Sequence, residues 1–210
     1  AVLSAIVTVM AVGRIAQGGK HLWLYVPMLF LLMMFVAAAV TAWSRCAGMP
    51  GIATDRKLFG QGAAWAAALS ILMLPVYHFW LDPLLRNAFL QARNGILLDL
   101  AYPPTAGGRL ALLLWSAGFQ VLFLQAAPMS MLARLTGHGP AAAGLCLVMR
   151  AYVAHLQIAD GGIVAGSMLI FITALATNAA GCILFARFGL VPAMLLAAGL
   201  NLHLFFVKTG

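Results

Sequence analysis

The sequence contains no glutamate, and its four acidic residues are all aspartates in a chain of 210 residues. Charged residues make up 8% of the chain, whereas roughly a quarter of the residues in a typical soluble domain are charged. Hydrophobic residues make up 64%. So few charges cannot cover the outside of a water-soluble fold, and most of the outer surface is therefore expected to face lipid.

Cysteine is also scarce. The three cysteines, Cys46, Cys146 and Cys182, are too few and too scattered for a disulfide framework or a paired-cysteine metal site. Cys146 and Cys182 lie within apolar runs, where a cysteine is expected to act as a small packing residue.

The net charge of +8 does not indicate a nucleic-acid partner. A nucleic-acid binder gathers its basic residues on one soluble face. Here most lysines and arginines stand singly or in small groups between apolar runs, as residues that anchor helix ends at anionic headgroups do. The expected partner is the lipid bilayer. Because the basic residues divide almost equally between the two predicted sides, the positive-inside rule does not decide the orientation.

Apolar runs predict the helices, since about 20 apolar residues cross a hydrocarbon core of about 30 Å. The predicted helices cover residues 1–12, 21–43, 60–81, 110–127, 140–156, 162–185 and 190–207. The first is too short to span the membrane as it stands, and we read it as a helix whose start is missing rather than as a signal peptide.

The segments between these runs carry the polar and helix-breaking residues. Residues 44–59 are expected to form a loop, and 84–100 an amphipathic helix at the membrane interface. Pro75 is expected to kink one helix and Pro128 to bend another. The sequence therefore predicts a single all-α domain over residues 1–210. This domain is a polytopic transmembrane bundle of about six or seven helices, multi-pass and typical of a bacterial inner membrane.

Several polar side chains fall at membrane depth, where each charged or strongly polar group is costly and needs a reason. We expect some of them to meet in one polar pocket. They are Gln120, Gln125, Arg150, His155, Asn178, Asn201 and His203.

These residues also have simpler interpretations. Arg150 can extend toward the interface, or pair with a carbonyl or a lipid phosphate. His155 suits a hydrogen bond between helices as well as a functional role. Asn201 is more typical of a hydrogen bond between helices than of a ligand. His203 lies near the end of its helix, where exposure to water is expected.

Three segments of the C-terminal half are similar to motifs of the CAAX-protease and bacteriocin-processing family of intramembrane proteases, also called CPBP or Abi. Residues 127–134 (APMSMLAR) resemble the family's acid pair followed by arginine, and 152–156 (YVAHL) its aromatic-to-histidine segment. Residues 187–193 (RFGLVPA), with Ala197 and Asn201, are similar to its closing pattern. The resemblance covers about residues 110–207 and implies a CPBP-like fold there.

The departures from the family pattern concern its catalytic groups. The two glutamates fall on Met129 and Ser130, and the last histidine falls on Ala197. Of the family positions, only Arg134, His155 and Asn201 remain. Because neither Met nor Ser can act as the general base that a carboxylate supplies, the resemblance implies a protein that has kept the fold and lost the protease.

The leading hypothesis is a non-catalytic integral membrane subunit or scaffold of a larger complex with other membrane proteins. One alternative is an intramembrane metal-dependent protease or hydrolase, in which His155 and Asn201 hold zinc. Another is a haem-binding subunit that uses His78, His155 or His203 as axial ligands. A transporter is disfavoured because the sequence shows no evident buried acid to couple ion movement.

Overall fold

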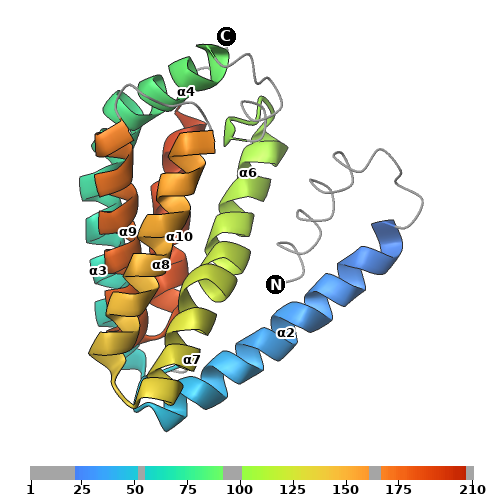
Figure 1. Ribbon diagram of the computed structural model, residues 1–210. Helices are drawn as coiled ribbons and strands as arrows, with labels where there is room; N and C mark the ends of the chain where they lie inside the picture. The colour runs from blue at the N-terminus through green and yellow to red at the C-terminus, as the bar shows by residue number, and fades with distance from the viewer. Residues whose placement is uncertain (1–21, 52–54, 92–100, 161–166, 207–210) are drawn as a thin grey trace.

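The computed structural model describes residues 22–51, 55–91, 101–160 and 167–206, which form helices and no strand (Figure 1). The all-α bundle is therefore confirmed. The elements are α2 (Leu22–Cys46), α3 (Arg56–Pro75), η2 (Val76–Leu81), α4 (Asp82–Gln91), α6 (Ala106–Trp115), η3 (Ser116–Gln120), η4 (Leu122–Ala126), α7 (Ala127–Thr136), α8 (Gly139–Asp160), α9 (Ser167–Phe188), α10 (Leu190–Leu200) and η5 (Asn201–Phe205). The helix predicted over 1–12, and residues 92–100 of the predicted interface helix, lie outside the described residues.

Three helical stretches of the described chain are long and apolar enough to cross a membrane: Arg56–Asn87, Ala106–Thr136 and Met168–Phe188. Two shorter apolar helices, Phe30–Cys46 and Leu190–Phe205, lie beside them. The helices run alternately up and down, and α4 turns across the upper end (Figure 1). This architecture is that of an integral membrane protein.

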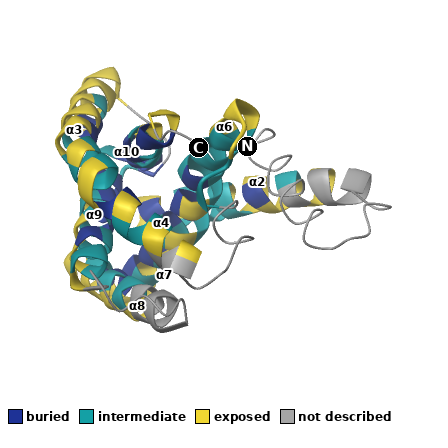
Figure 2. Ribbon diagram, turned by 90° about the horizontal axis from the view of Figure 1, so that it is seen from above, coloured by how far each residue is buried: buried dark blue, intermediate teal, exposed yellow. Residues whose placement is uncertain are grey.

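Many large apolar side chains lie on the outside of the bundle, and a few small polar side chains are buried with the apolar core. Large apolar residues such as Phe35 and Met168 are 72% and 76% exposed, whereas Ser44 and Ser130 are completely buried. Seen from above, exposed residues follow the outer faces of the helices and buried residues the inner faces (Figure 2). Such an apolar exterior suits contact with lipid or with other apolar protein surfaces rather than with water.

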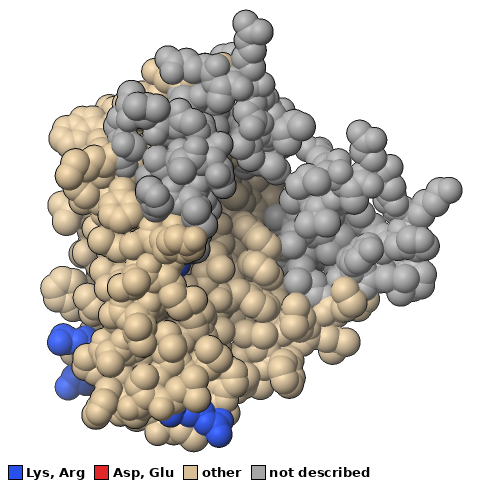
Figure 3. All heavy atoms as spheres, in the orientation of Figure 1, with Lys and Arg blue, Asp and Glu red and all other residues tan. Residues whose placement is uncertain are grey.

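Basic side chains mark the lower end of the bundle. Arg45 and Arg187 lie in the last turns of α2 and α9, and Arg134 in the last turn of α7. Arg56 and Lys57 begin α3. The Lys and Arg side chains that stand out in Figure 3 lie at this end.

The connection between α2 and α3 is shorter than the predicted loop over 44–59. Helix α2 ends at Cys46, and Gly48 follows with a φ of 70°. This conformation permits the hydrogen bond from Met49 N–H to Ser44 O. This is a glycine-terminated helix end. Helix α3 begins at Arg56 because the Asp55 carboxylate accepts a hydrogen bond from Lys57 N–H at 3.1 Å.

Pro75, at the end of α3, and Pro128, in the first turn of α7, both lie next to π-helical turns. Pro75 is followed by η2, and the chain continues through α4. The helix continues through Pro128, with η3 and η4 before it, and the bend that the sequence predicts at this residue stays a prediction. A proline lacks its N–H and its ring crowds the carbonyl one turn earlier, so a wider turn just before Pro128 accommodates the ring.

Helices α3 and α10 pack against each other through very small residues. Gly62, Ala66 and Ser70 are the buried residues of α3 and recur every four positions along one face. A Cβ at Gly62 would lie 2.6 Å from side-chain atoms of Phe188 and Pro192. A Cβ at Gly199 of α10 would lie 2.2 Å from Ser70 Oγ. In lipid, such close approach supplies the packing that holds helices together.

The contact between Ser70 and Gly199 can be tested by adding a methyl group at Gly199 and removing the side chain of Ser70. Gly199→Ala is expected to destabilise the protein by about 1–3 kcal/mol, the usual cost of overpacking. Combining it with Ser70→Gly should recover most of the loss, because the space vacated on α3 receives the new methyl group. Thermal unfolding midpoints in a mild detergent measure both effects.

The control for this cycle is Gly60→Ala, at an exposed position of α3 where a Cβ would meet nothing within 4 Å. This variant should be neutral or slightly stabilising, since alanine is the better helix former. If Gly199→Ala behaved like the control, α3 and α10 would not pack as described.

Candidate functional site

A cavity of about 250 Å³ lies within the bundle. Its lining comes from the π-helical turns and from α8, α9, α10 and η5. The lining residues are Tyr77, Ser116, Gln120, Gln125, Arg150, Ala174, Thr177, Asn178, Gly181, Ala193, Leu196, Ala197, Leu200 and Asn201. Five of the seven polar residues placed at membrane depth by the sequence are therefore brought together. His203 lies elsewhere, and the side chain of His155 on α8 is outside the described part of the structure.

The amide of Asn178 is the centre of the polar network. Its Oδ1 accepts one hydrogen bond from Arg150 Nε at 3.0 Å and another from Gln125 Nε2 at 2.9 Å. Its Nδ2 donates to Ala174 O at 2.7 Å, which fixes the orientation of the amide. One buried asparagine thus ties α8 and the η4 turn to α9.

The π-helical turns bring the glutamines onto the cavity. Hydrogen bonding in a π-helix joins residues five apart, so residues at that spacing lie one above the other. Gln120 and Gln125 have this spacing, and η3 and η4 contain them. Gly181 makes room for Gln125, because a Cβ at this position of α9 would lie 2.7 Å from Gln125 Oε1.

The upper part of the cavity is closed by Asn201. Its Nδ2 donates to Ser116 Oγ and to Ala197 O, both at 2.8 Å. Ser116 Oγ in turn donates to Leu113 O at 3.0 Å. Asn201 therefore joins η5 to η3, the kind of link between helices that its amide suggested.

Two buried thiols lie directly behind Arg150. Cys146 of α8 and Cys182 of α9 have sulfur atoms 4.0 Å apart, and Cys146 Sγ lies 4.0 Å from Gln125 O. Both are free cysteines. The sequence indicated small packing residues at these positions, and their proximity could not be read from the isolated apolar runs.

This pair gives a direct test of the packing between α8 and α9. In a Cys46→Ala variant, oxidation with copper phenanthroline should consume both remaining thiols and form a disulfide within one chain. The sulfur atoms must approach from 4.0 Å to about 2.05 Å, a small movement for two side chains that already touch. Mass spectrometry of the unreduced protein checks the bond. Two unreacted thiols, or only covalent dimers, would contradict the arrangement.

A second polar cluster lies at the upper end, where the chain turns from η2 into α4. Asp82 Oδ1 is 3.2 Å from His203 Nε2 and accepts a hydrogen bond from Tyr102 Oη at 3.1 Å. His203 Nδ1 also lies against Leu200 O, so both ring nitrogens face acceptors. Asp82 and His203 are buried. The exposure expected for His203 was therefore wrong, because its ring lies inside the bundle against Asp82 and Leu200 O.

Asp82 was missed as a buried acid. The sequence placed it in a segment outside the membrane, and the transporter hypothesis was disfavoured on the ground that no buried acid was evident. The predicted helices alternate in direction, which puts residues near 82 and 203 at the same end of the bundle. The sequence therefore did contain a signal that Asp82 and His203 could meet. The Tyr77 ring, which lines the cavity, also packs 5.1 Å from the His203 ring. The two polar clusters are therefore neighbours.

Burial raises the pKa of Tyr102, and the negative charge of Asp82 raises it further. The neutral phenol is thus favoured in the folded protein. The unfolded chain ionises near the ordinary value of 10.0, so this stabilisation is complete below pH 10 and is lost as the pH rises above it.

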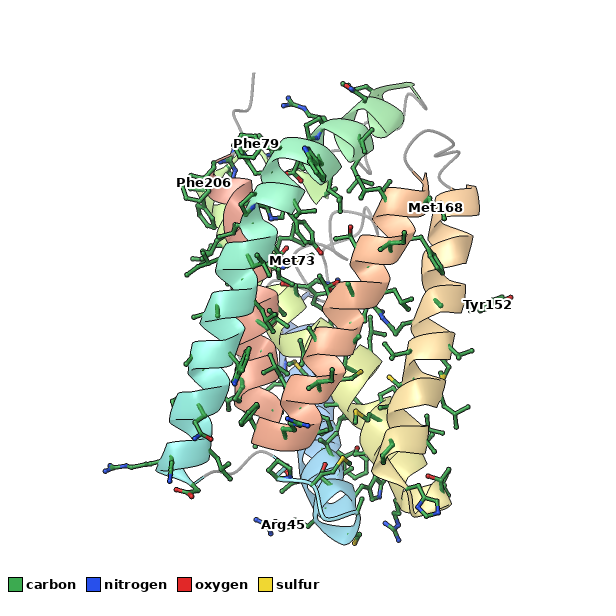
Figure 4. The ribbon with its side chains drawn as sticks, turned by 90° about the vertical axis from the view of Figure 1, so that its left-hand side faces the viewer. Arg45, Met73, Phe79, Tyr152, Met168 and Phe206 are labelled. Atoms are coloured by element: carbon green, nitrogen blue, oxygen red, sulfur yellow. The ribbon has the colours of Figure 1, made fainter. Side chains whose placement is uncertain are left out.

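We therefore predict that Tyr102→Phe lowers the free energy of unfolding by about 1–3 kcal/mol at neutral pH, since a hydrogen bond to a carboxylate is lost. The difference from the natural protein should shrink above pH 10. Unfolding in detergent at pH 7 to 11 measures this. Tyr152→Phe is the control, because Tyr152 projects away from the bundle (Figure 4) and is 63% exposed. A pH-independent difference would contradict the buried contact.

The positions that carry the family resemblance do not converge on the cavity. Arg134 is exposed in the last turn of α7. Met129 and Ser130 are buried outside the cavity lining, and Ser130 Oγ donates to Ala127 O. Ala197 and Asn201 do line the cavity.

The zinc alternative uses His155 with Asn201, and the haem alternative uses His78, His155 or His203. The described residues contain no group of three His, Cys, Asp or Glu side chains suited to a metal ion. The amide nitrogen of Asn201 makes two hydrogen bonds, which leaves its oxygen as the atom that could ligate a metal. His203 has both ring nitrogens engaged. An axial bond to iron through His203 would have to replace one of those contacts.

Comparison with protein families, with curated proteins and with solved structures finds no match.

Proposed function

We propose that this chain is a non-catalytic, multi-pass subunit of a membrane complex, of the bacterial inner-membrane kind, that binds an amphiphilic molecule in its central cavity. The observation that carries the proposal is the chemistry of the lining. Amides, hydroxyl groups and one guanidinium converge at membrane depth, which is costly without a ligand or partner to interact with them.

The lining favours binding over catalysis. Among the described residues, no carboxylate, imidazole or thiol lines the cavity. The Ser116 hydroxyl, the candidate nucleophile of the lining, donates a hydrogen bond to Leu113 O and has an amide rather than a base beside it. Activation of a hydroxyl requires an adjacent base. The resemblance to the CPBP proteases supports the same proposal, since the family's glutamates fall on Met129 and Ser130.

The shape of the cavity supports an amphiphile. A volume of about 250 Å³ is slightly below the usual range for whole drug-sized ligands, which is about 300–1,000 Å³. It holds a polar head but not long acyl chains. Gln120 lines the cavity and is exposed, so the cavity opens at the lipid-facing surface beside η3.

The experiment is purification from native membranes in a mild detergent, with mass spectrometry of co-migrating proteins and of small molecules released on denaturation. We expect a membrane protein partner in stoichiometric amount and a retained amphiphile. Recovery of the chain alone would contradict the subunit role. Bound zinc, or a haem absorption spectrum, would favour the hydrolase or haem alternatives that involve His155.

A matched pair of variants assigns the retained molecule to the cavity. Ala197→Leu adds volume to the lining from α10 and should release the amphiphile. Ala68→Leu adds the same volume at an exposed position of α3 and should retain it. If both variants kept the molecule, it would bind elsewhere on the protein.

A further inference from the structure

The guanidinium group of Arg150 has no anionic partner among the described residues. Its Nε donates to Asn178, and no other hydrogen bond from the group is made within the described residues. Asp82 is paired with His203, and Asp55 caps α3 at the lower end. Asp160 lies ten residues further along α8, or about 15 Å at 1.5 Å per residue.

The remaining donors of Arg150 are available to the cavity. A guanidinium has five N–H groups in a planar fork, and only the Nε–H is used here. The four N–H groups on the two terminal nitrogens are therefore free of described protein acceptors. Because Asn178 is itself fixed by Ala174 O, the plane of the fork is held in place before any ligand arrives. Such a fork matches the paired oxygens of a carboxylate or phosphate.

Beside the guanidinium group of Arg150, the side chain of Gln125 also lacks a hydrogen-bond partner for its oxygen among the described residues. Its Nε2 is bound to Asn178, while its Oε1 is buried and has no hydrogen-bond donor among the described residues. A buried acceptor of this kind calls for a donor. Arg150 and Gln125 therefore present an anion site with an acceptor next to it, which suits a hydroxylated or protonated oxyanion.

Resting on the function proposed above, we propose that the cavity binds an oxyanion, a phosphate or a carboxylate, through the terminal nitrogens of Arg150. A hydrogen-bond donor of the same ligand meets Gln125 Oε1. The anion compensates a cation that would otherwise stand uncompensated at membrane depth. The source of the anion is the headgroup of a lipid or a free oxyanion, and the experiment separates them.

The test uses the full chain in an uncharged detergent, with the thermal unfolding midpoint measured against increasing probe concentration. Three probes are compared: dihexanoyl phosphatidic acid, inorganic phosphate and the neutral monooctanoylglycerol. The expected result is saturable stabilisation by the phosphatidic acid. Stabilisation by inorganic phosphate to the same extent at similar concentrations would identify a free anion as the ligand. Stabilisation by the lipid alone would identify a headgroup.

Variants identify the residue that provides the charge. Arg150→Gln should weaken the apparent affinity for the anionic probe at least tenfold, and Arg150→Lys should weaken it less, since the charge is kept and the fork is lost. Arg134→Gln removes an exposed arginine at the lower end and should leave the affinity unchanged.

A measurement without any probe separates a binding role from a structural one. An uncompensated cation at membrane depth is costly, and glutamine removes the charge while keeping an amide donor for Asn178 Oδ1. Arg150→Gln without ligand should therefore unfold at the same or a higher temperature than the natural chain. A lower midpoint, together with unchanged affinity for the anion, would overturn the proposal. Should Arg150→Gln fail to fold, native mass spectrometry of the natural chain decides by showing whether an anionic molecule is retained.

Different results would contradict the oxyanion site and the binding function. If monooctanoylglycerol stabilised the protein to the same extent as phosphatidic acid, and Ala197→Leu abolished both effects, the cavity would bind an amphiphile without recognising its charge. If no probe stabilised the protein and no molecule were retained on purification, the binding function itself would be wrong.

Discussion

The cost of placing an arginine and several amides within the bilayer is the constraint on which the rest of this structure depends. Asn178 meets that constraint by accepting hydrogen bonds from Arg150 and Gln125 with one oxygen. Its other amide atom is held by the backbone of α9. The network fixes the relative positions of α8, α9 and η4, and it leaves the charged fork of Arg150 facing the cavity. Structure and proposed function therefore arise from the same side chains.

Close packing of α10 on α3 supports that arrangement from the opposite side. Gly62, Ala66 and Ser70 allow α10 to lie against α3, and Leu196, Ala197 and Asn201 are thereby held at the cavity. In lipid the hydrophobic effect does not drive helices together, so shape and interhelical hydrogen bonds have this role. The π-helical turns before Pro128 complete the site, since they turn Gln120 and Gln125 onto one face.

The fold class was predictable because it follows from apolar length and from the scarcity of charge, which are properties of the whole chain. The polar lining was predictable in part, since each polar residue inside an apolar run is conspicuous by itself. Helix details were less accessible. The continuation through Pro128 depends on π-helical hydrogen bonding, which apolar periodicity does not reveal. The burial of Asp82 and His203 depends on a contact between residues 121 positions apart, which single-segment reasoning does not contain.

The most direct test of this account is an experimental structure of the protein in nanodiscs made from native lipids, at a resolution that shows side chains and bound headgroups. We expect an oxyanion within hydrogen-bond distance of the terminal nitrogens of Arg150, with Asn178 bridging Arg150 and Gln125. An Arg150 side chain turned out of the bundle toward the membrane surface, with Asn178 and Gln125 apart, would contradict it.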